Sequence, residues 1–137
     1  MKTLRSALVV FALLFVATAA HAQHTALNAT IPFNFVVGDR TYPAGDYSFQ
    51  SNGPVLRVLD GDKMLVGTIL SNSCTEVLPS RDTKLVFQSM GGYYFLQQMW
   101  VAGHTSGREL PKSKTETRLA KNHIQAESVV VAANLTH

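Results

Sequence analysis

The segment VLRVLDGDKMLVGTIL, residues 55–70, carries the clearest fold signal in the chain. Two apolar runs, residues 55–59 and 64–70, flank the polar tetrapeptide DGDK at residues 60–63. Asp-Gly between apolar runs is a strong signal for a β-hairpin, because the tight turn needs positive φ angles, which Gly and Asp tolerate. We therefore predict an antiparallel hairpin here.

A second hairpin signal follows. The runs KLVFQS, residues 84–89, and YYFLQQMWV, residues 93–101, flank the pair Gly91-Gly92. Apolar runs of this length, joined by two glycines, are typical of two paired strands. A polar stretch, residues 71–83, separates the two hairpins.

Two further strand patterns precede the first hairpin. Residues 31–37 place Phe33, Phe35 and Val37 on one face of a predicted strand. Residues 47–50 alternate apolar and polar side chains with period two, as a half-buried strand does. Six strands in about 70 residues predict a mainly β fold: a single antiparallel β-sandwich or a small barrel.

The C-terminal third has a different character. Residues 103–108 are interpreted as a loop. Ser113 and Glu116 fit a capping box, which predicts a short polar helix from Lys114 to about His123. Residues 129–133, VVVAA, predict a last strand, for about seven in all, and their continuous apolar character would suit a central position in a sheet.

The N-terminus has the three parts of a secretory signal. Two basic residues precede 11 consecutive apolar residues, 7–17, and Ala20 and Ala22 form an A-x-A site before Gln23. A helix that spans a membrane needs roughly 18 or more apolar residues, so this run is too short to be an anchor. We therefore predict cleavage after Ala22 and export to the periplasm or the medium, with no transmembrane anchor after cleavage.

Removing residues 1–22 changes the charge of the chain. It leaves residues 23–137, which are 115 of the 137 residues and suit a single β-rich domain. Lys2 and Arg5 are lost, so 10 of the 12 basic side chains remain against 9 acidic ones. A nearly neutral domain lacks the basic surface that nucleic-acid binding requires, so we expect no nucleic-acid partner.

Cys74 is the only cysteine in the chain, so no internal disulfide can form. It lies in the polar run SNSCT, residues 71–75. We interpret it as a small, half-buried residue at a strand end, because unpaired cysteines are often simply buried. The alternative is a disulfide with a partner chain or a reactive thiol.

No motif for a metal, a cofactor or catalysis is present. Beyond the predicted signal, the histidines are His24, His104, His123 and His137, and none has the H-x-H or H-E-x-x-H spacing of zinc sites. The best catalytic candidate is His104 with Ser106, but such a pair needs hydrogen-bond contact and a third group that orients the base. We therefore assign no catalytic residue.

The aromatic residues of the 93–101 run are the candidate binding residues. Alternation puts Tyr93 and Phe95, with Gln97 and Met99, on one face of the strand. It puts Tyr94 and Trp100, with Leu96 and Gln98, on the other. One face must belong to the core. The other face either packs under the C-terminal segment or forms an exposed aromatic platform for a sugar ring or a partner protein.

Four phrases carry a resemblance. They are IPFNFVVGD at residues 31–39, YPAGDY at 42–47, SKTE at 113–116 and LAK at 119–121. Over most of residues 29–133 the chain resembles a group of short, uncharacterised exported proteins of environmental bacteria. The resemblance implies a coherent domain of bacterial origin and, because that group has no assigned activity, no functional residue.

Three functions are expected, in this order. The first is a non-enzymatic periplasmic or secreted module that binds a partner protein or contributes to an envelope assembly. The second is a small barrel that carries an apolar or carbohydrate ligand, for which we expect an enclosed apolar cavity of roughly 300 Å³ or more. The third is an enzyme with its site near His104.

Overall fold

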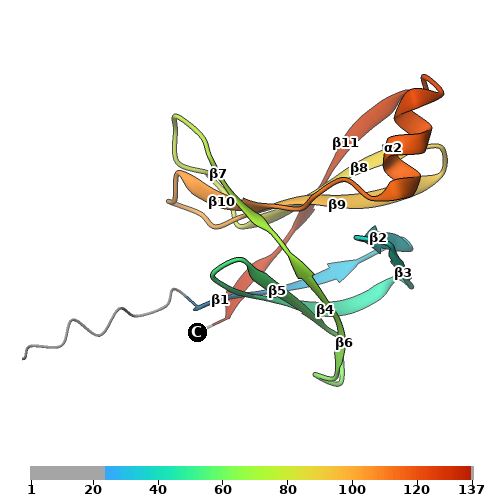
Figure 1. The fold of residues 1–137 in the computed structure, drawn as a ribbon. Coiled ribbons are helices and arrows are strands. Elements are labelled where there is room, and N and C mark those ends of the chain that lie inside the picture. Colours follow the sequence, from blue (N-terminus) through green and yellow to red (C-terminus); the bar gives the residue numbers. More distant parts are fainter. Residues whose placement is uncertain (1–23, 137) are drawn as a thin grey trace, which may run out of the picture.

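The computed structural model describes residues 24–136, which form twelve strands and one helix. The predicted signal peptide and its cleavage site lie outside these described residues. The strands form two sheets that pack face to face and do not close into a barrel (Figure 1). The predicted mainly β fold is confirmed as a sandwich, with more strands than the seven expected.

The first sheet has five strands, each antiparallel to its neighbours. In spatial order they are β12 (Asn134–Thr136), β1 (His24–Ile31), β4 (Gly45–Asn52), β5 (Val55–Leu59) and β6 (Leu65–Leu70).

The second sheet has seven strands. Its main path runs β11 (Ala126–Ala132), β8 (Lys84–Met90), β9 (Tyr93–Trp100), β10 (Ser106–Glu109) and β7 (Asn72–Thr75). A short strand, β2 (Phe35–Val37), pairs parallel with β9 and antiparallel with β3 (Arg40–Tyr42).

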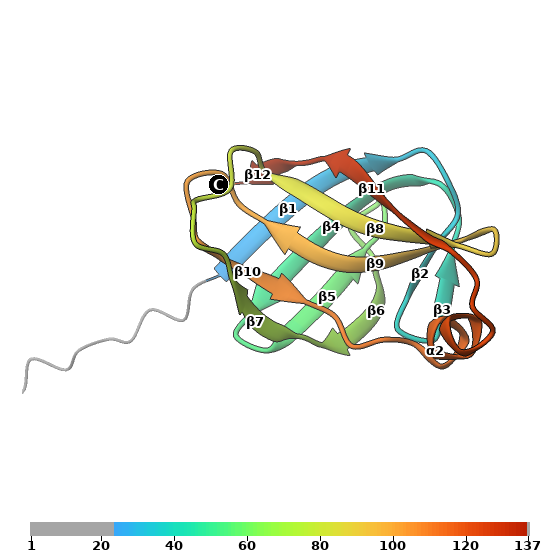
Figure 2. The same ribbon diagram turned by 90° about the horizontal axis from the view of Figure 1, so that it is seen from above.

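Two single residues carry the chain from one sheet to the other. Ser71 lies between β6 and β7, and Ala133 lies between β11 and β12. Both corner residues are buried and donate their backbone N–H groups, Ser71 to Pro54 O at 2.7 Å and Ala133 to Thr83 O at 3.0 Å. Each long side of the sandwich is therefore bordered by one bent, nearly continuous strand (Figures 1 and 2).

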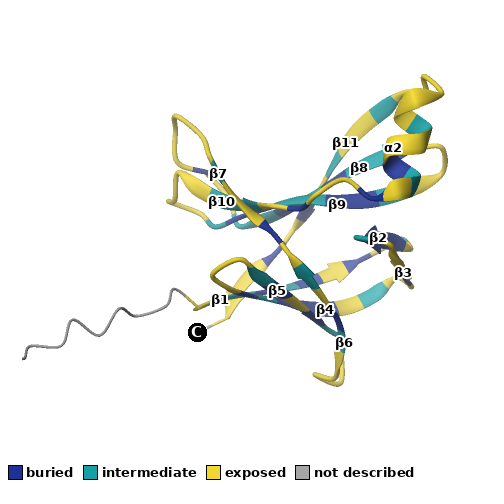
Figure 3. Cartoon of the chain, in the orientation of Figure 1, coloured by how far each residue is buried: buried dark blue, intermediate teal, exposed yellow. Residues whose placement is uncertain are grey.

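The core lies between the sheets, on whose strands the buried residues concentrate (Figure 3). It is rich in aromatic rings. Phe35 is fully buried, with the ring of Tyr47 edge-on at 5.0 Å and that of Phe87 at 5.8 Å. Burial of such a side chain contributes about 1.5–3 kcal/mol to the stability of the fold.

The β5–β6 hairpin is confirmed, but its turn differs from the prediction. The positive φ angle, 62°, is at Lys63 and not at Gly61. The carboxylate of Asp60 accepts the backbone N–H groups of Asp62 and Met64, each at 3.0 Å. These hydrogen bonds to the Asp60 side chain stabilise the turn. The prediction had instead relied on the ability of Asp-Gly to adopt positive φ angles.

The β8–β9 hairpin is confirmed, with φ angles of 59° at Gly91 and 84° at Gly92. A register shift in this pair leaves Gln97 as an extra residue in β9, because Val86 faces Gln98 whereas Phe87 faces Leu96. Such a bulge reverses the alternation of side chains. Leu96 and Met99, predicted on opposite faces, therefore both belong to the main core.

Three predicted segments were wrong in extent. The strand predicted over residues 31–37 is interrupted after Ile31, because β1 belongs to one sheet and β2 to the other, and Pro32 has no N–H to donate. The polar stretch 71–83 contains β7, and the predicted loop 103–108 overlaps β10.

The single helix among the described residues is α2 (Lys114–Lys121). Its cap is confirmed, since the Ser113 hydroxyl accepts the N–H of Glu116 at 3.1 Å. The Glu116 side chain is buried and accepts a hydrogen bond from Gln97 Nε2 at 2.6 Å. Within residues 24–136 no helix has the length and apolar character needed to cross a bilayer.

The last predicted strand also has a different place from the one its composition suggested. β11 is not central but forms an edge of the seven-stranded sheet, where it pairs with β8. Val130, in the middle of its apolar run, is exposed.

Candidate functional site

A cleft of about 580 Å³ opens between the two sheets. It lies at the end of the sandwich where β1 begins and β12 ends, opposite the end that carries α2 (Figures 1 and 2). Strands of both sheets line it, with the loop between β9 and β10 on one side.

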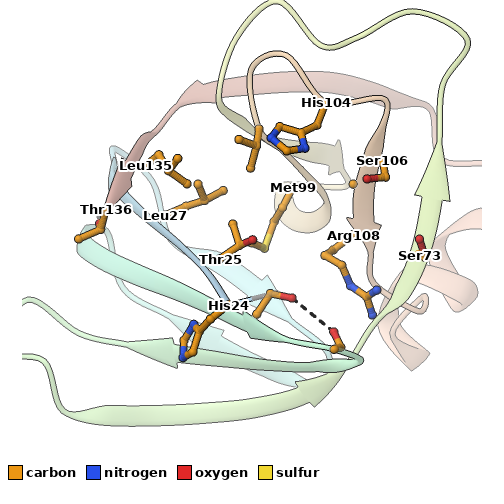
Figure 4. Close-up of a pocket in the computed structure, with 14 residues that line it drawn as sticks. His24, Thr25, Leu27, Ser73, Met99, His104, Ser106, Arg108, Leu135 and Thr136 are labelled. Atoms are coloured by element: carbon orange, nitrogen blue, oxygen red, sulfur yellow. Dashed lines mark hydrogen bonds between the residues drawn. The ribbon is translucent and has the colours of Figure 1, made fainter. Parts of the chain in front are cut away.

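The floor of the cleft is apolar. Leu27 and Met99, from opposite sheets, both line it and are buried parts of the core. Val101 and Leu135 extend this apolar surface toward solvent. Figure 4 shows Leu27, Met99 and Leu135 grouped in the middle of the site. An apolar part of a ligand would therefore be shielded from water by side chains of both sheets.

Three basic side chains, Arg108, His24 and His104, surround this apolar floor on different sides (Figure 4). Among the described residues, no Asp or Glu lines the cleft. The charge within the cleft is therefore positive at every physiological pH, because the Arg108 guanidinium does not lose its proton.

Arg108, on β10, is held in place by the corner residue Ser71. Its Nε donates to Ser71 Oγ at 3.0 Å, and its Nη2 donates to Ser71 O at 2.5 Å. A guanidinium has five N–H donors, so Ser71 orients the group and leaves donors for a ligand. Hydroxyl groups complete the polar lining, from Thr25, Ser51, Ser73, Ser106 and Thr136.

His104 and Ser106, the candidate catalytic pair, both line this cleft. Within the part of the chain that the structure describes, no hydrogen bond joins their side chains, and no carboxylate in the cleft orients the imidazole. Nucleophilic catalysis needs both contacts. The same part of the chain holds no group of three or more His, Cys, Asp or Glu residues arranged for a metal ion.

The four candidate aromatic residues do not come together on one surface. Trp100 and Phe95 are both buried, with 2% of each side chain exposed. Tyr94 is half-buried and stacks on Phe33, with ring centroids 3.9 Å apart. Tyr93 alone of the four is exposed, at 43%, so the described residues of β9 do not form the aromatic platform.

Two different coverings bury these rings. Trp100 packs against the bare backbone of Gly107 on the neighbouring strand. Phe95 belongs to a small second cluster with Val36 and Met90, against which Leu119 of α2 packs. Packing on both faces of β9, one of the two alternatives, accounts for its apolar character.

Cys74 lies within β7 and is half-buried, opposite Gly107 of β10. Burial raises the pKa of its thiol above the ordinary value, and the nearby Glu109 carboxylate raises this pKa further. The reactive thiolate therefore forms only at higher pH.

We expect the pH at which iodoacetamide alkylates Cys74 at half its maximal rate to lie above that of the same protein unfolded in guanidinium chloride. The unfolded thiol should titrate near its ordinary pKa of about 8.5. Alkylation rates measured from pH 6 to 11 by mass spectrometry test this. A folded midpoint at or below the unfolded one would contradict the burial argument.

Sequence reasoning missed Arg108, Ser71 and Leu135. Arg108 and Leu135 belong to the short strands β10 and β12, and Ser71 is the corner residue before the short strand β7. The sequence of these segments is typical of a polar loop or a terminus. Period-two patterns are weak signals over three or four residues. The meeting of these residues also depends on long-range pairing, as in Gly107 with Cys74. The basic side chain followed by a carboxylate at residues 108–109 is ordinary surface sequence.

No family model, curated protein or solved structure matches this chain.

Proposed function

We propose that this protein is an exported, non-enzymatic binding module whose cleft holds a small amphiphilic anion. The ligand class is an apolar tail with a carboxylate or phosphate head. One observation carries the proposal: the cleft joins an apolar floor, formed by Leu27 and Met99, to three basic side chains and no acidic one. Export is proposed on the N-terminal signal sequence.

The size of the cleft supports a ligand rather than ordered water alone. Its volume of about 580 Å³ lies within the range of roughly 300–1,000 Å³ typical of small-molecule sites. The tail would lie on Leu27, Met99 and Val101, and the head would meet Arg108. An arginine fork is suited to a planar carboxylate or to a phosphate, because it can donate two parallel hydrogen bonds.

A carbohydrate ligand is less well supported than an amphiphilic anion. Sugar rings are commonly recognised by stacking on aromatic side chains, whereas no Phe, Tyr or Trp of the described residues lines the cleft. In this proposal the ligand binds in a cleft between two sheets, whereas the sequence analysis expected a carrier to hold it inside a barrel.

Arg108→Gln is expected to weaken the binding of decanoate and of decyl phosphate by about 10- to 100-fold, since a hydrogen bond to a charged group contributes ~1.5–3 kcal/mol. Isothermal titration calorimetry below the critical micelle concentrations measures this effect. Decanol, which has the same tail without a charge, should bind the unaltered protein and the variant equally weakly.

Arg57→Gln is the matched control, because Arg57 is an exposed arginine of β5 that does not line the cleft. It should bind both anions as the unaltered protein does. Equal losses in the two variants would indicate a non-specific charge effect. Absence of binding by the unaltered protein, or decanol binding as tight as decanoate binding, would refute the proposal.

A further inference from the structure

Each long side of the sandwich presents strand edges with no partner. Within residues 24–136, β6 pairs only with β5 and β7 only with β10, so one side of the molecule is bordered by β6 and β7. On the opposite side, β12 pairs only with β1, and β11 only with β8. Unpaired edges offer rows of backbone N–H and C=O groups to another strand.

Protective features are confined to the beginnings of the two sides, where β11 carries the exposed Glu127 and a register shift leaves Val66 as an extra residue in β6. Residues 64–75 and residues 128–136 contain no charged side chain and no proline. Natural sheets commonly place Lys or Pro, or a bulge, at such positions to prevent edge-to-edge pairing. Two side chains also cover the start of β6, where Arg40 and the Tyr42 hydroxyl both donate to Val66 O, at 3.2 Å and 3.4 Å. The rest of β6 and all of β7 lie beyond these contacts.

Exposed apolar side chains concentrate on these two sides. Of the nine large apolar residues that are exposed among the described residues, four lie on the edge strands: Leu65 and Leu70 on β6, Val130 on β11 and Leu135 on β12. Three more, Met64, Val77 and Leu78, lie in the segments just before β6 and just after β7. Leu70, at the end of β6, is 66% exposed, and Val130, in the middle of β11, is 56% exposed. Such a concentration along unpaired edges indicates surfaces for association rather than scattered exposure.

The two sides match each other strand for strand. One side runs from the five-stranded sheet to the seven-stranded sheet, through the single corner residue Ser71. The other runs from the seven-stranded sheet to the five-stranded sheet, through the single corner residue Ala133. If β6 lies beside β12 and β7 beside β11 of another molecule, the two chains run in opposite directions. Both contacts are then antiparallel, as are the existing pairs of all four strands.

We propose that the β6–β7 side of one molecule pairs with the β11–β12 side of a second copy of this chain. The contact extends both sheets at once and covers Leu70 on one copy and Val130 on the other. A two-fold contact of the β6–β7 side with itself fits less well, because antiparallel pairing would join β6 of one sheet to β7 of the other sheet.

The contact is heterologous, because it joins different surfaces of the two copies. It leaves one free side at each end of a pair, so further molecules can add, as an open chain or, where the rotation closes, as a ring. Leu70 and Val130, the residues that the contact covers, do not line the cleft, although Ser73 of β7 and Leu135 and Thr136 of β12 do. The assembly can therefore be tested independently of the ligand.

The test uses two variants that each place a charge on one side, Leu70→Lys and Val130→Lys. Sedimentation velocity of the purified protein should show dimers and larger species growing with concentration, whereas each variant alone should remain monomeric. An equimolar mixture should form dimers and nothing larger. The Leu70→Lys molecule keeps an intact β11–β12 side, the Val130→Lys molecule keeps an intact β6–β7 side, and both free ends of the mixed dimer carry a lysine.

Ile124→Lys is the matched control, because Ile124 is exposed but lies on neither side, and this variant should assemble like the unaltered protein. Recovery of dimers in the mixture also shows that both variants are folded. The proposal is overturned if the unaltered protein stays monomeric up to its solubility limit, or if Val130→Lys dimerises as well as the unaltered protein does. A mixture that stays monomeric would overturn it equally.

Discussion

Replacing Gly107 with Ala is expected to lower the free energy of unfolding by about 3 kcal/mol, at the upper end of the usual cost of overpacking. A Cβ atom on Gly107 would lie 2.6 Å from the backbone oxygen of Met99. It would also lie 2.8 Å and 2.9 Å from two ring carbons of Trp100. Both obstacles are rigid, because Met99 O belongs to a paired strand and the Trp100 ring is buried.

The position of Gly107 explains why the cost should be large. Gly107 pairs with Trp100 on β9 and with Cys74 on β7, so the strand has neighbours on both sides and cannot move away from the ring. The indole lies over the glycine backbone, and its Nε1 donates to Gln98 Oε1 at 3.1 Å. A large ring that covers a strand glycine is a recognised way to stabilise a sheet at that position.

Urea denaturation followed by tryptophan fluorescence measures the effect directly, because Trp100 is the only tryptophan. Gly61→Ala is the control: a Cβ there meets its nearest neighbour, Asp46 O, at an ordinary 3.7 Å. We expect the control to change the free energy of unfolding by less than about 1 kcal/mol. Equal stability of the Gly107→Ala variant and the unaltered protein would contradict the packing argument.

Replacing Gly67 with Ala is the second substitution with a large expected effect, a loss of about 2–3 kcal/mol. A Cβ on this β6 residue would overlap Tyr42 Oη and would lie 3.2 Å from Tyr42 Cζ. Tyr42 is buried, and its ring stacks on Phe35 with centroids 5.5 Å apart. The tyrosine would have to leave this position, and its hydroxyl would lose the hydrogen bond to Val66 O.

A double-mutant cycle isolates this contact. Tyr42→Phe removes the oxygen that the new Cβ would overlap, at the cost of one long hydrogen bond of 3.4 Å. In the Tyr42→Phe background, Gly67→Ala should therefore be less destabilising by at least about 1 kcal/mol, a coupling in the range found for residues in contact. Additive effects of the two substitutions, measured by urea denaturation, would show that the Cβ does not meet the hydroxyl.

These two glycines illustrate what the sequence could not indicate. Gly67 and Gly107 each read as an ordinary residue in a strand or loop pattern, because the side chain that excludes a Cβ comes from another strand. In contrast, Gly91-Gly92 was predicted correctly, since the turn that needs those glycines is made by the residues beside them. Local backbone requirements are visible in a sequence, whereas close approaches between distant segments are not.

The same distinction separates the predicted site from the observed one. The aromatic run of β9 was correctly predicted as a strand, but the bulge at Gln97 and the covering of Trp100 and Phe95 left Tyr93 alone exposed among the four candidates. His104 and Ser106 were singled out, and they do line a cleft. Arg108 was not, because its importance comes from Ser71, 37 residues away in the chain, and from the sheet across the gap.

The sequence by itself determined the β class, both hairpins and the capped helix, since these depend on side-chain period, turn residues and caps within a few positions of one another. It also predicts the signal peptide. Only the tertiary structure decided that the sheets form an open sandwich and that single residues at Ser71 and Ala133 turn the chain between them. It also decided that Leu27, Met99 and Arg108 line the same cleft. Those features depend on strand pairing over long separations, where burial of the whole core selects among many local possibilities.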